Sequence, residues 1–280
     1  MPGLILEGGT FRPIFSSGIM DALLAHDIMF DYVIGVSAGI TNGFSYLSRQ
    51  TGRNLDVLCQ YRNDKRYLSA KNYIKQGSVF GIDFVFDTIP NELLPFDWDT
   101  FHAYTGKILV GVTNAETGCC EYLDGRLLDA KCTMLRATCA IPLYFPPVQI
   151  ESKTYYDGGI SDSIPIRKAL QDGSEKNLII LTQPSGYRKK TTRANRAAAA
   201  VLRQNYPKMA EAILQRPKRY NETVCLCEQL VKHQPQNTVL LRPKNPIHSF
   251  ERDIQKLTAA YQEGYQLAES RIDEIKALFA

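Results

Sequence analysis

The sequence lacks any uncharged apolar run of the roughly 18 residues that a membrane-spanning helix requires. Its apolar runs at 107–112 and 178–181 have the length of buried strands instead. No basic segment followed by about 7–15 apolar residues stands near its start, so no secretory signal is expected. Hydrophobic residues make up 44% and charged residues 22%, which excludes wholesale disorder. These features predict a globular protein of the cytoplasm.

Cofactor motifs are scarce as well. The seven cysteines include no Cys-x-x-Cys pair, so neither a disulfide framework nor a zinc ribbon is expected, and we predict no metal site. Neither Gly-x-Gly-x-x-Gly nor a Gly-Lys-Ser/Thr phosphate loop occurs, which argues against a nucleotide cofactor. We expect no cofactor.

The first half of the chain alternates short apolar runs with helical patterns, which is typical of an α/β fold with a mainly parallel sheet. Helices are expected at 15–26 and 38–49. A segment rich in aromatic and acidic residues, about 51–105, interrupts the alternation. The expected strands are residues 4–6, 32–36, 107–112, 153–156 and 178–182.

The segment 188–219 carries ten Lys/Arg against one acid, Glu211, a local net charge of +9 in a chain of +4 overall. Apolar residues recur there at helical spacing, with basic residues beside them. The pattern predicts either a helix packed on the core with a solvated basic face or peripheral contact with an anionic membrane. Aromatic residues are sparse there, so nucleic acid is not an expected partner. The helically spaced apolar residues are Leu202, Tyr206, Met209 and Ile213.

The final segment shows the clearest helical period, from Phe250 to Phe279, and predicts a helix docked on the core. We therefore expect a catalytic domain over 1–185, with a cap or lid at about 51–105. A basic, mainly helical extension over 186–280 is expected to pack on it.

Residues 35–39 read Gly-Val-Ser-Ala-Gly, between an apolar strand and a helical pattern. This is the setting of a nucleophile elbow, in which glycines allow a sharp turn and the serine oxygen is exposed at a helix N-terminus. Ser37 is therefore the candidate nucleophile. Gly8, Gly9 and Thr10 follow the first strand and can aim backbone amides at the oxyanion, although a tight turn alone would need the same glycines.

The general base is not decided by spacing. His233 and His248 follow the serine as in α/β-hydrolases, but only one strand precedes Ser37 here, whereas that fold has several. A carboxylate is the alternative, and both Asp157, in Asp-Gly-Gly, and Asp124, in Asp-Gly, are candidates.

Three blocks together resemble the patatin-like phospholipases, and the compact size and basic carboxyl-terminal extension look most like the bacterial members. The three blocks are Gly8-Gly-Thr-Phe-Arg12, Gly35-Val-Ser-Ala-Gly39 and Asp157-Gly-Gly159, and a fourth block, residues 136–147, is also similar. The resemblance covers about residues 4–185. It implies a three-layer α/β/α sandwich with a mainly parallel sheet and a Ser37–Asp157 dyad without histidine. It also implies metal-independent hydrolysis of lipid esters, of phospholipase A or lysophospholipase type, with amides of Gly8, Gly9, Thr10 and Ala38 around the oxyanion.

Two residues depart from the family's Gly-Gly-Gly-x-Arg-Gly loop. Thr10 replaces the third glycine and narrows the space beside the reacting carbonyl, and Pro13 replaces the last and suits the first turn of a helix. Arg12 is a candidate for contact with a lipid headgroup, or for pairing with an acid.

The aromatic segment from Phe80 to Trp98 is interpreted either as the wall of an acyl groove or as a patch of core. Two other functions stay open: a Ser–His–Asp esterase or thioesterase, and a catalytically weak protein that binds membrane surfaces.

Overall fold

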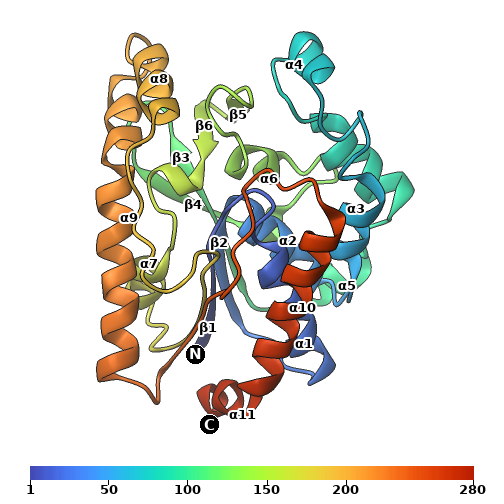
Figure 1. Cartoon of the computed structure of the whole chain (residues 1–280), viewed down its shortest axis with the longest axis vertical. Coiled ribbons are helices and arrows are strands. Elements are labelled where there is room, and N and C mark those ends of the chain that lie inside the picture. The colour runs from blue at the N-terminus through green and yellow to red at the C-terminus, as the bar shows by residue number, and fades with distance from the viewer.

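The computed structural model describes residues 1–280, and all five predicted strands belong to one sheet (Figure 1). The hydrogen-bonding order is β5-β6-β3-β2-β1-β7-β8, with β4 also paired to β3. Strands β8, β7, β1, β2 and β3 are parallel, while β4 and β6 run antiparallel to β3. The strands are β1 (Pro2–Leu6), β2 (Tyr32–Val36), β3 (Lys107–Asn114), β4 (Cys120–Asp124), β5 (Val148–Ile150), β6 (Lys153–Asp157), β7 (Lys176–Ile180) and β8 (Thr238–Leu241).

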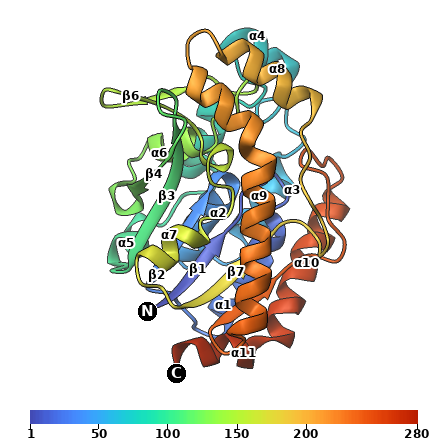
Figure 2. The ribbon, with the colours of Figure 1, turned by 90° about the vertical axis from the view of Figure 1, so that its left-hand side faces the viewer.

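Side chains of the central strands alternate between two buried faces, because successive residues of a strand point in opposite directions. Leu4 and Leu6 of β1 belong to a large cluster with helices α1 (Ile14–Ala25), α2 (Ser37–Leu47) and α10 (Ile254–Ser270). Ile5 belongs to a second cluster with α7 (Ile166–Gln171) and α9 (Pro207–His233). Helices therefore cover both faces of the sheet, as Figures 1 and 2 show, and the predicted three-layer α/β/α sandwich is confirmed.

The predicted cap region forms short helices beside α2, in the part of the chain that connects α2 to β3. They are α3 (Arg53–Tyr61), α4 (Ala70–Gln76), the π-helical segment η1 (Phe84–Leu93) and α5 (Trp98–Ala103). Three short helices lie nearer the other strands: η2 (Gly125–Leu127), α6 (Thr133–Thr138) and η3 (Gly158–Ile160).

The structure of the carboxyl-terminal part differs in two respects from what its sequence pattern predicts. It contributes strand β8, which pairs with β7 and was not predicted. The basic segment forms two helices, because α8 (Arg193–Leu202) ends before Pro207 starts α9. Its apolar residues Leu202, Met209 and Ile213 are nevertheless buried, as expected.

The last periodic segment divides into α10, α11 (Ile272–Lys276) and η4 (Ala277–Phe279), so it is not one continuous helix. Its helix α10 docks on α1. No helix in the structure has the length and apolar character needed to cross a membrane. Both chain termini lie at the end of the molecule where β1 begins, so the carboxyl ends of the parallel strands point away from them (Figure 1).

Candidate active site

Strand β3 brings the ends of β2 and β6 together. One edge of β3 is occupied by β4, and the other edge pairs first with β2 and then with β6. Val36, the last residue of β2, lies opposite Gly111, and Asp157, the last residue of β6, lies opposite Val112. Because β2 and β6 approach from opposite directions, Ser37, the residue after β2, meets Asp157.

Ser37 occupies a sharp turn from β2 into α2. Its φ of +52° lies in the left-handed region, where a side chain is strained. Gly39 permits the turn, since a Cβ there would lie 2.4 Å from the carbonyl oxygen of Glu7. The Ser37 amide donates to Thr138 Oγ1 at 2.8 Å, and that hydroxyl donates to the Gly111 carbonyl at 2.6 Å. These contacts define a sharp strand-to-helix turn at Ser37, which is the local structure that the sequence predicted there.

The two predicted catalytic side chains are in direct contact. Ser37 Oγ donates to Asp157 Oδ2 at 2.6 Å, and the Gly159 amide donates to Asp157 Oδ1 at 2.8 Å. Both side chains are buried, with Ser37 5% and Asp157 4% exposed. Burial raises the pKa of Asp157 above its ordinary value of 3.8, although the Ser37 hydrogen bond and the charge of Arg216 oppose that shift. The serine hydroxyl therefore has a proton acceptor of raised basicity.

The predicted oxyanion loop lies against the elbow. A Cβ on Gly8 would lie 2.8 Å from the Ser37 Cβ, so the loop approaches the serine as only glycine allows. The amides of Gly8, Gly9 and Thr10 donate to no other backbone group. Ala38 lies in the first turn of α2, where an N–H has no intrahelical acceptor. Thr10 has a φ of +58°, the left-handed conformation that suits the glycine it replaces.

A cavity of about 150 Å³ opens beside Ser37. Seventeen of its 25 lining residues are hydrophobic, which suits an apolar ligand. The aromatic segment contributes Phe80, Phe86 and Phe96 to this lining, whereas Trp98 packs edge-on against Phe96 with ring centroids 4.9 Å apart. Phe80, Phe86 and Phe96 also belong to the large buried cluster, so this segment contributes both to the cavity wall and to the core.

The other candidate bases lie elsewhere. No histidine forms a hydrogen bond with Ser37 or Asp157; His26, for example, contacts Glu269 at 3.0 Å. Asp124 accepts from the Arg126 amide at the start of η2 and does not reach Ser37. Of these candidate bases, Asp157 is the one that contacts Ser37.

Arg12 does not pair with an acid. Its Nε donates to Thr182 Oγ1 at 3.3 Å, and its Nη1 donates to Ser249 Oγ. Pro13 directly precedes α1 and accepts from the Ser17 amide at 2.9 Å, in agreement with its predicted place at a helix start.

Sequence reasoning missed three residues around the dyad: Thr138, Lys189 and Arg216. Thr138 lies within the block 136–147 that resembles the family, and that block was the available signal. The charges of Lys189 and Arg216 act on Asp157, and both stand in the basic segment interpreted as a solvated or membrane-facing surface.

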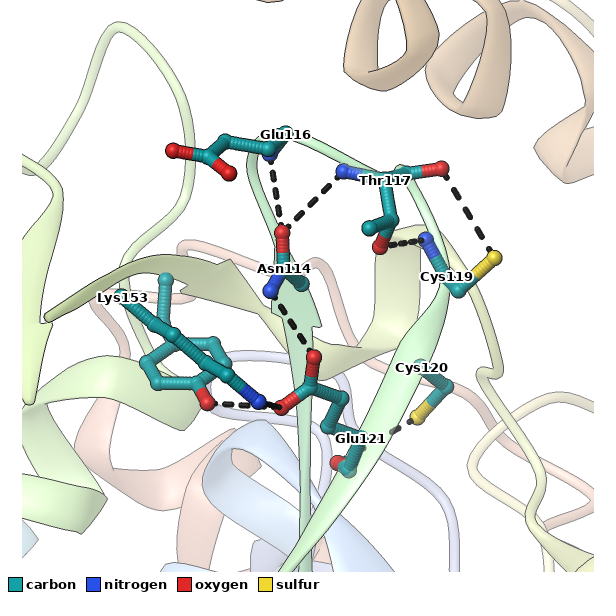
Figure 3. A network of polar contacts seen from close by, with 8 residues as sticks. Asn114, Glu116, Thr117, Cys119, Cys120, Glu121 and Lys153 are labelled. Carbon is teal, nitrogen blue, oxygen red and sulfur yellow. Dashed lines mark hydrogen bonds and ion pairs between the residues drawn. The ribbon is translucent and has the colours of Figure 1, made fainter.

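A polar network beyond the dyad holds β6 in register with β3 and β4 (Figure 3). Glu121 of β4 accepts from Asn114 Nδ2 at 2.8 Å, from Lys153 Nζ at 2.9 Å and from the Tyr155 hydroxyl at 2.7 Å. The three donors come from β3 and β6. This network fixes the strand that ends in Asp157.

A family model for patatin-like phospholipases matches residues 4–170, which include the elbow, the oxyanion loop and Asp157. The chain belongs to the patatin-like phospholipase family. A second family model, a domain of unknown function designated DUF6363, matches residues 206–280. The predicted family is thus confirmed, and the carboxyl-terminal part of this patatin-like protein matches a separate family model whose function is unknown.

Two curated relatives are similar to this chain over part of their length. The uncharacterized protein YjjU of Escherichia coli K12 is 29% identical over 189 residues, 65% of this chain and 52% of YjjU. The probable lipid hydrolase 463L of Invertebrate iridescent virus 6 is 25% identical over 194 residues, 62% of this chain and 65% of the viral protein. The alignments thus span about half to two thirds of the length of these relatives. Among solved structures, VipD from Legionella pneumophila aligns with 97% of this chain and 66% of its own, at 13% identity and a TM-score of 0.48.

Proposed function

We propose that the protein hydrolyses carboxylic esters of lipids, with Ser37 as nucleophile and Asp157 as general base. The observation that carries the proposal is the 2.6 Å hydrogen bond from Ser37 Oγ to a buried carboxylate, at an elbow that opens on an apolar cavity. The family and the viral relative, a probable lipid hydrolase, support the lipid class.

In the first step Asp157 Oδ2 takes the proton of the Ser37 hydroxyl while Oγ attacks the ester carbonyl carbon. The negative charge on the carbonyl oxygen is stabilised by amides of Gly8, Gly9, Thr10 and Ala38. Collapse of this intermediate breaks the ester C–O bond, and the alcohol leaves with the proton from Asp157. An acyl-serine remains, with the fatty chain in the apolar cavity.

In the second step a water molecule gives its proton to Asp157 and attacks the acyl carbonyl, under the same amides. The proton returns to Ser37 Oγ as the fatty acid is released. Every proton is transferred by Ser37, Asp157 or water. A phospholipase A or lysophospholipase specificity would follow from this scheme with a glycerophospholipid as the substrate.

A fluorophosphonate probe tests the proposal without knowledge of the lipid. Intact mass is expected to show one adduct on the native chain and none on Ser37→Ala. Turnover of a lysophospholipid and of a short-chain ester should fall at least about a thousandfold in Ser37→Ala and in Asp157→Asn. An adduct that persists in Ser37→Ala, or turnover retained by either variant, would overturn the dyad. His233→Ala and His248→Ala serve as controls, and a large loss in either would establish the Ser–His–Asp alternative.

We also propose peripheral contact with anionic membranes through the segment 188–219. Six of its basic residues are exposed and have no carboxylate partner, and Val201 on α8 is 63% exposed. The Ser37→Ala protein is expected to sediment with anionic vesicles at low salt and to be released at high salt. Equally strong binding to neutral and to anionic vesicles would contradict this proposal. The six residues are Lys190, Arg193, Arg196, Arg203, Lys208 and Lys218.

A further inference from the structure

Two cations near the dyad form no hydrogen bond and no ion pair through their side chains. The side chain of Arg216, on α9, donates no hydrogen bond, and its Nε is shielded from solvent. The Lys189 amine, in the loop before α8, also donates none, and neither residue forms an ion pair, unlike neighbouring Arg188, which pairs with Glu228 at 2.8 Å. Arg216 Nε is thus a buried donor without an acceptor, which is uncommon because such a donor loses its water without a replacement.

Both cations are held in place by the fold. The Lys189 backbone is held at both ends by the Asn221 amide on α9, which accepts from its N–H at 2.8 Å and donates to its carbonyl at 3.1 Å. The Lys189 amine lies 4.3 Å from the centroid of the Tyr220 ring. Arg216 reaches the turn after β6, where its Nη2 lies 3.3 Å from the position of a Cβ on Gly159.

The local charge favours an anion. The positive charges of Arg216 and Arg12 act on the Lys189 amine, and that of Arg12 acts on Arg216. The carboxylates whose charges act on Lys189 are Glu7 and Asp157. Burial, followed by the charges of Arg216 and Arg12, lowers the pKa of Lys189 to about 7. Glu7 already accepts from the Thr182 amide at 2.6 Å, and Asp157 is engaged by Ser37. Positive charge thus exceeds negative charge around a site with vacant donors.

We propose that Lys189 and Arg216 form a subsite for a phosphate group next to the dyad. The guanidinium and the ammonium are the groups that proteins use to bind phosphate oxygens. Both come from the part of the chain beyond the patatin-like match, which ends at residue 170. The carboxyl-terminal part would therefore contribute to the substrate preference of the catalytic domain.

The subsite extends the proposed function, on which it rests, by naming an anionic substrate class. The apolar cavity lies with α2 and α3 on one face of the sheet, whereas Arg216 comes from α9 on the other. A glycerophospholipid has this same arrangement, since its acyl chain and its phosphate extend in different directions from the scissile ester. Free phosphate offers the same oxygens, and the experiment separates the two sources.

The test compares a monoacylglycerol with the lysophosphatidic acid of the same acyl chain, which differs only by the phosphate. Both are presented in neutral detergent micelles to the native protein, Lys189→Gln, Lys189→Arg and Lys232→Gln. The ratio of kcat/KM for the phosphorylated over the neutral lipid is expected to fall about tenfold in Lys189→Gln. It should be largely retained in Lys189→Arg, which keeps the charge, and unchanged in Lys232→Gln, an exposed basic residue near the end of α9. An unchanged ratio in Lys189→Gln, or an equal loss on both lipids, overturns the subsite.

Inorganic phosphate as an inhibitor of monoacylglycerol hydrolysis identifies the source. Inhibition that is lost in Lys189→Gln shows that the cations bind phosphate without a lipid attached. A changed ratio without inhibition assigns the subsite to a lipid headgroup.

If the native protein hydrolyses neither lipid, the subsite is judged by binding alone, and the fluorophosphonate probe judges the proposed function separately. Inorganic phosphate should then raise the Tm of the native protein and of Lys232→Gln more than that of Lys189→Gln. An equal rise in all three overturns the subsite.

Discussion

Ser37 Oγ lies 2.6 Å from Asp157 Oδ2, although 120 positions separate the two residues in the chain. The contact unites a strained backbone position with a buried carboxylate, and each is unfavourable for the folded state by itself. Such a pair is retained where activity requires it, at some expense of stability.

Asp157→Asn should therefore be inactive. Its free energy of unfolding, compared with that of the native protein, should be more favourable at pH 7 than at pH 4. Because folding raises the pKa of Asp157, its protonated carboxyl stabilises the folded state at pH values below the unfolded pKa of 3.8. This stabilisation is lost as the pH rises through the folded pKa. Asparagine does not titrate. Urea unfolding of both proteins at the two pH values measures the difference, and a variant that loses more stability at pH 7 than at pH 4 would refute the assignment.

The acid limb of catalysis should lie above the usual range for aspartate. Asp157 must be ionised to take the serine proton, so kcat/KM should fall as pH falls through its raised pKa. The charge of Arg216 lowers that pKa, and Arg216→Gln should move the limb to higher pH. A pH profile of kcat/KM on a neutral ester tests both statements. A limb that does not move in Arg216→Gln would show that this charge does not act on the base.

Thr10→Gly should raise both stability and turnover. Thr10 has a φ of +58°, a conformation that costs a non-glycine residue about 1–2 kcal/mol, and glycine's freedom in the unfolded chain offsets part of the gain. We expect a net increase of about 1 kcal/mol in the free energy of unfolding. Because Thr10 lines the cavity beside Ser37, kcat/KM for bulky esters should also increase.

Glu151→Gly is the matched control for Thr10→Gly, since Glu151 has a φ of +53° on an exposed turn. It should gain similar stability with unchanged turnover. If Thr10→Gly instead lowers kcat/KM, the threonine side chain contributes to the oxyanion loop.

Gly264→Ala should destabilise the fold by about 2 kcal/mol or more, because a Cβ there would lie 2.0 Å from the Phe15 carbonyl oxygen on α1. Helices α10 and α1 thus pack backbone against backbone. Gln262→Ala, an exposed change on the same helix, should stay within about 0.5 kcal/mol of the native value. Denaturant unfolding of the three proteins measures their free energies of unfolding. An unchanged value in Gly264→Ala would mean that α10 and α1 can move apart without a loss of stability.

Much of the sheet could be predicted from its sequence because its strands are continuous apolar runs bounded by turns. Leu178–Ile180 is such a run, and it is buried on both faces. Strand β8 escaped prediction because Thr238–Leu241 is only four residues long and follows a polar segment. The break before α9 was missed because apolar spacing continues across it, whereas Pro207 restricts the residue before it to an extended conformation.

The candidate site also contains residues that the sequence predicted and residues that it did not. The flanking glycines and the strand before them predicted the elbow at Ser37, because steric limits on a turn are local. The choice of Asp157 over Asp124 came from resemblance to a family, not from spacing. Lys189 and Arg216 could not be recognised, since a basic residue in an amphipathic segment has the same sequence pattern whether it faces solvent or a site.

The sequence by itself determined the local elements, the nucleophile elbow, the glycine loop and the family, because backbone sterics and hydrophobic periodicity act over a few residues. The tertiary structure decided which carboxylate meets the serine, since that depends on β2 and β6 sharing one edge of β3. It also decided which cations turn inward, since α9 must first pack on the sheet for Arg216 to reach the turn beside Asp157. Contacts of this kind depend on distant segments that are buried together, and no single stretch of the chain encodes them.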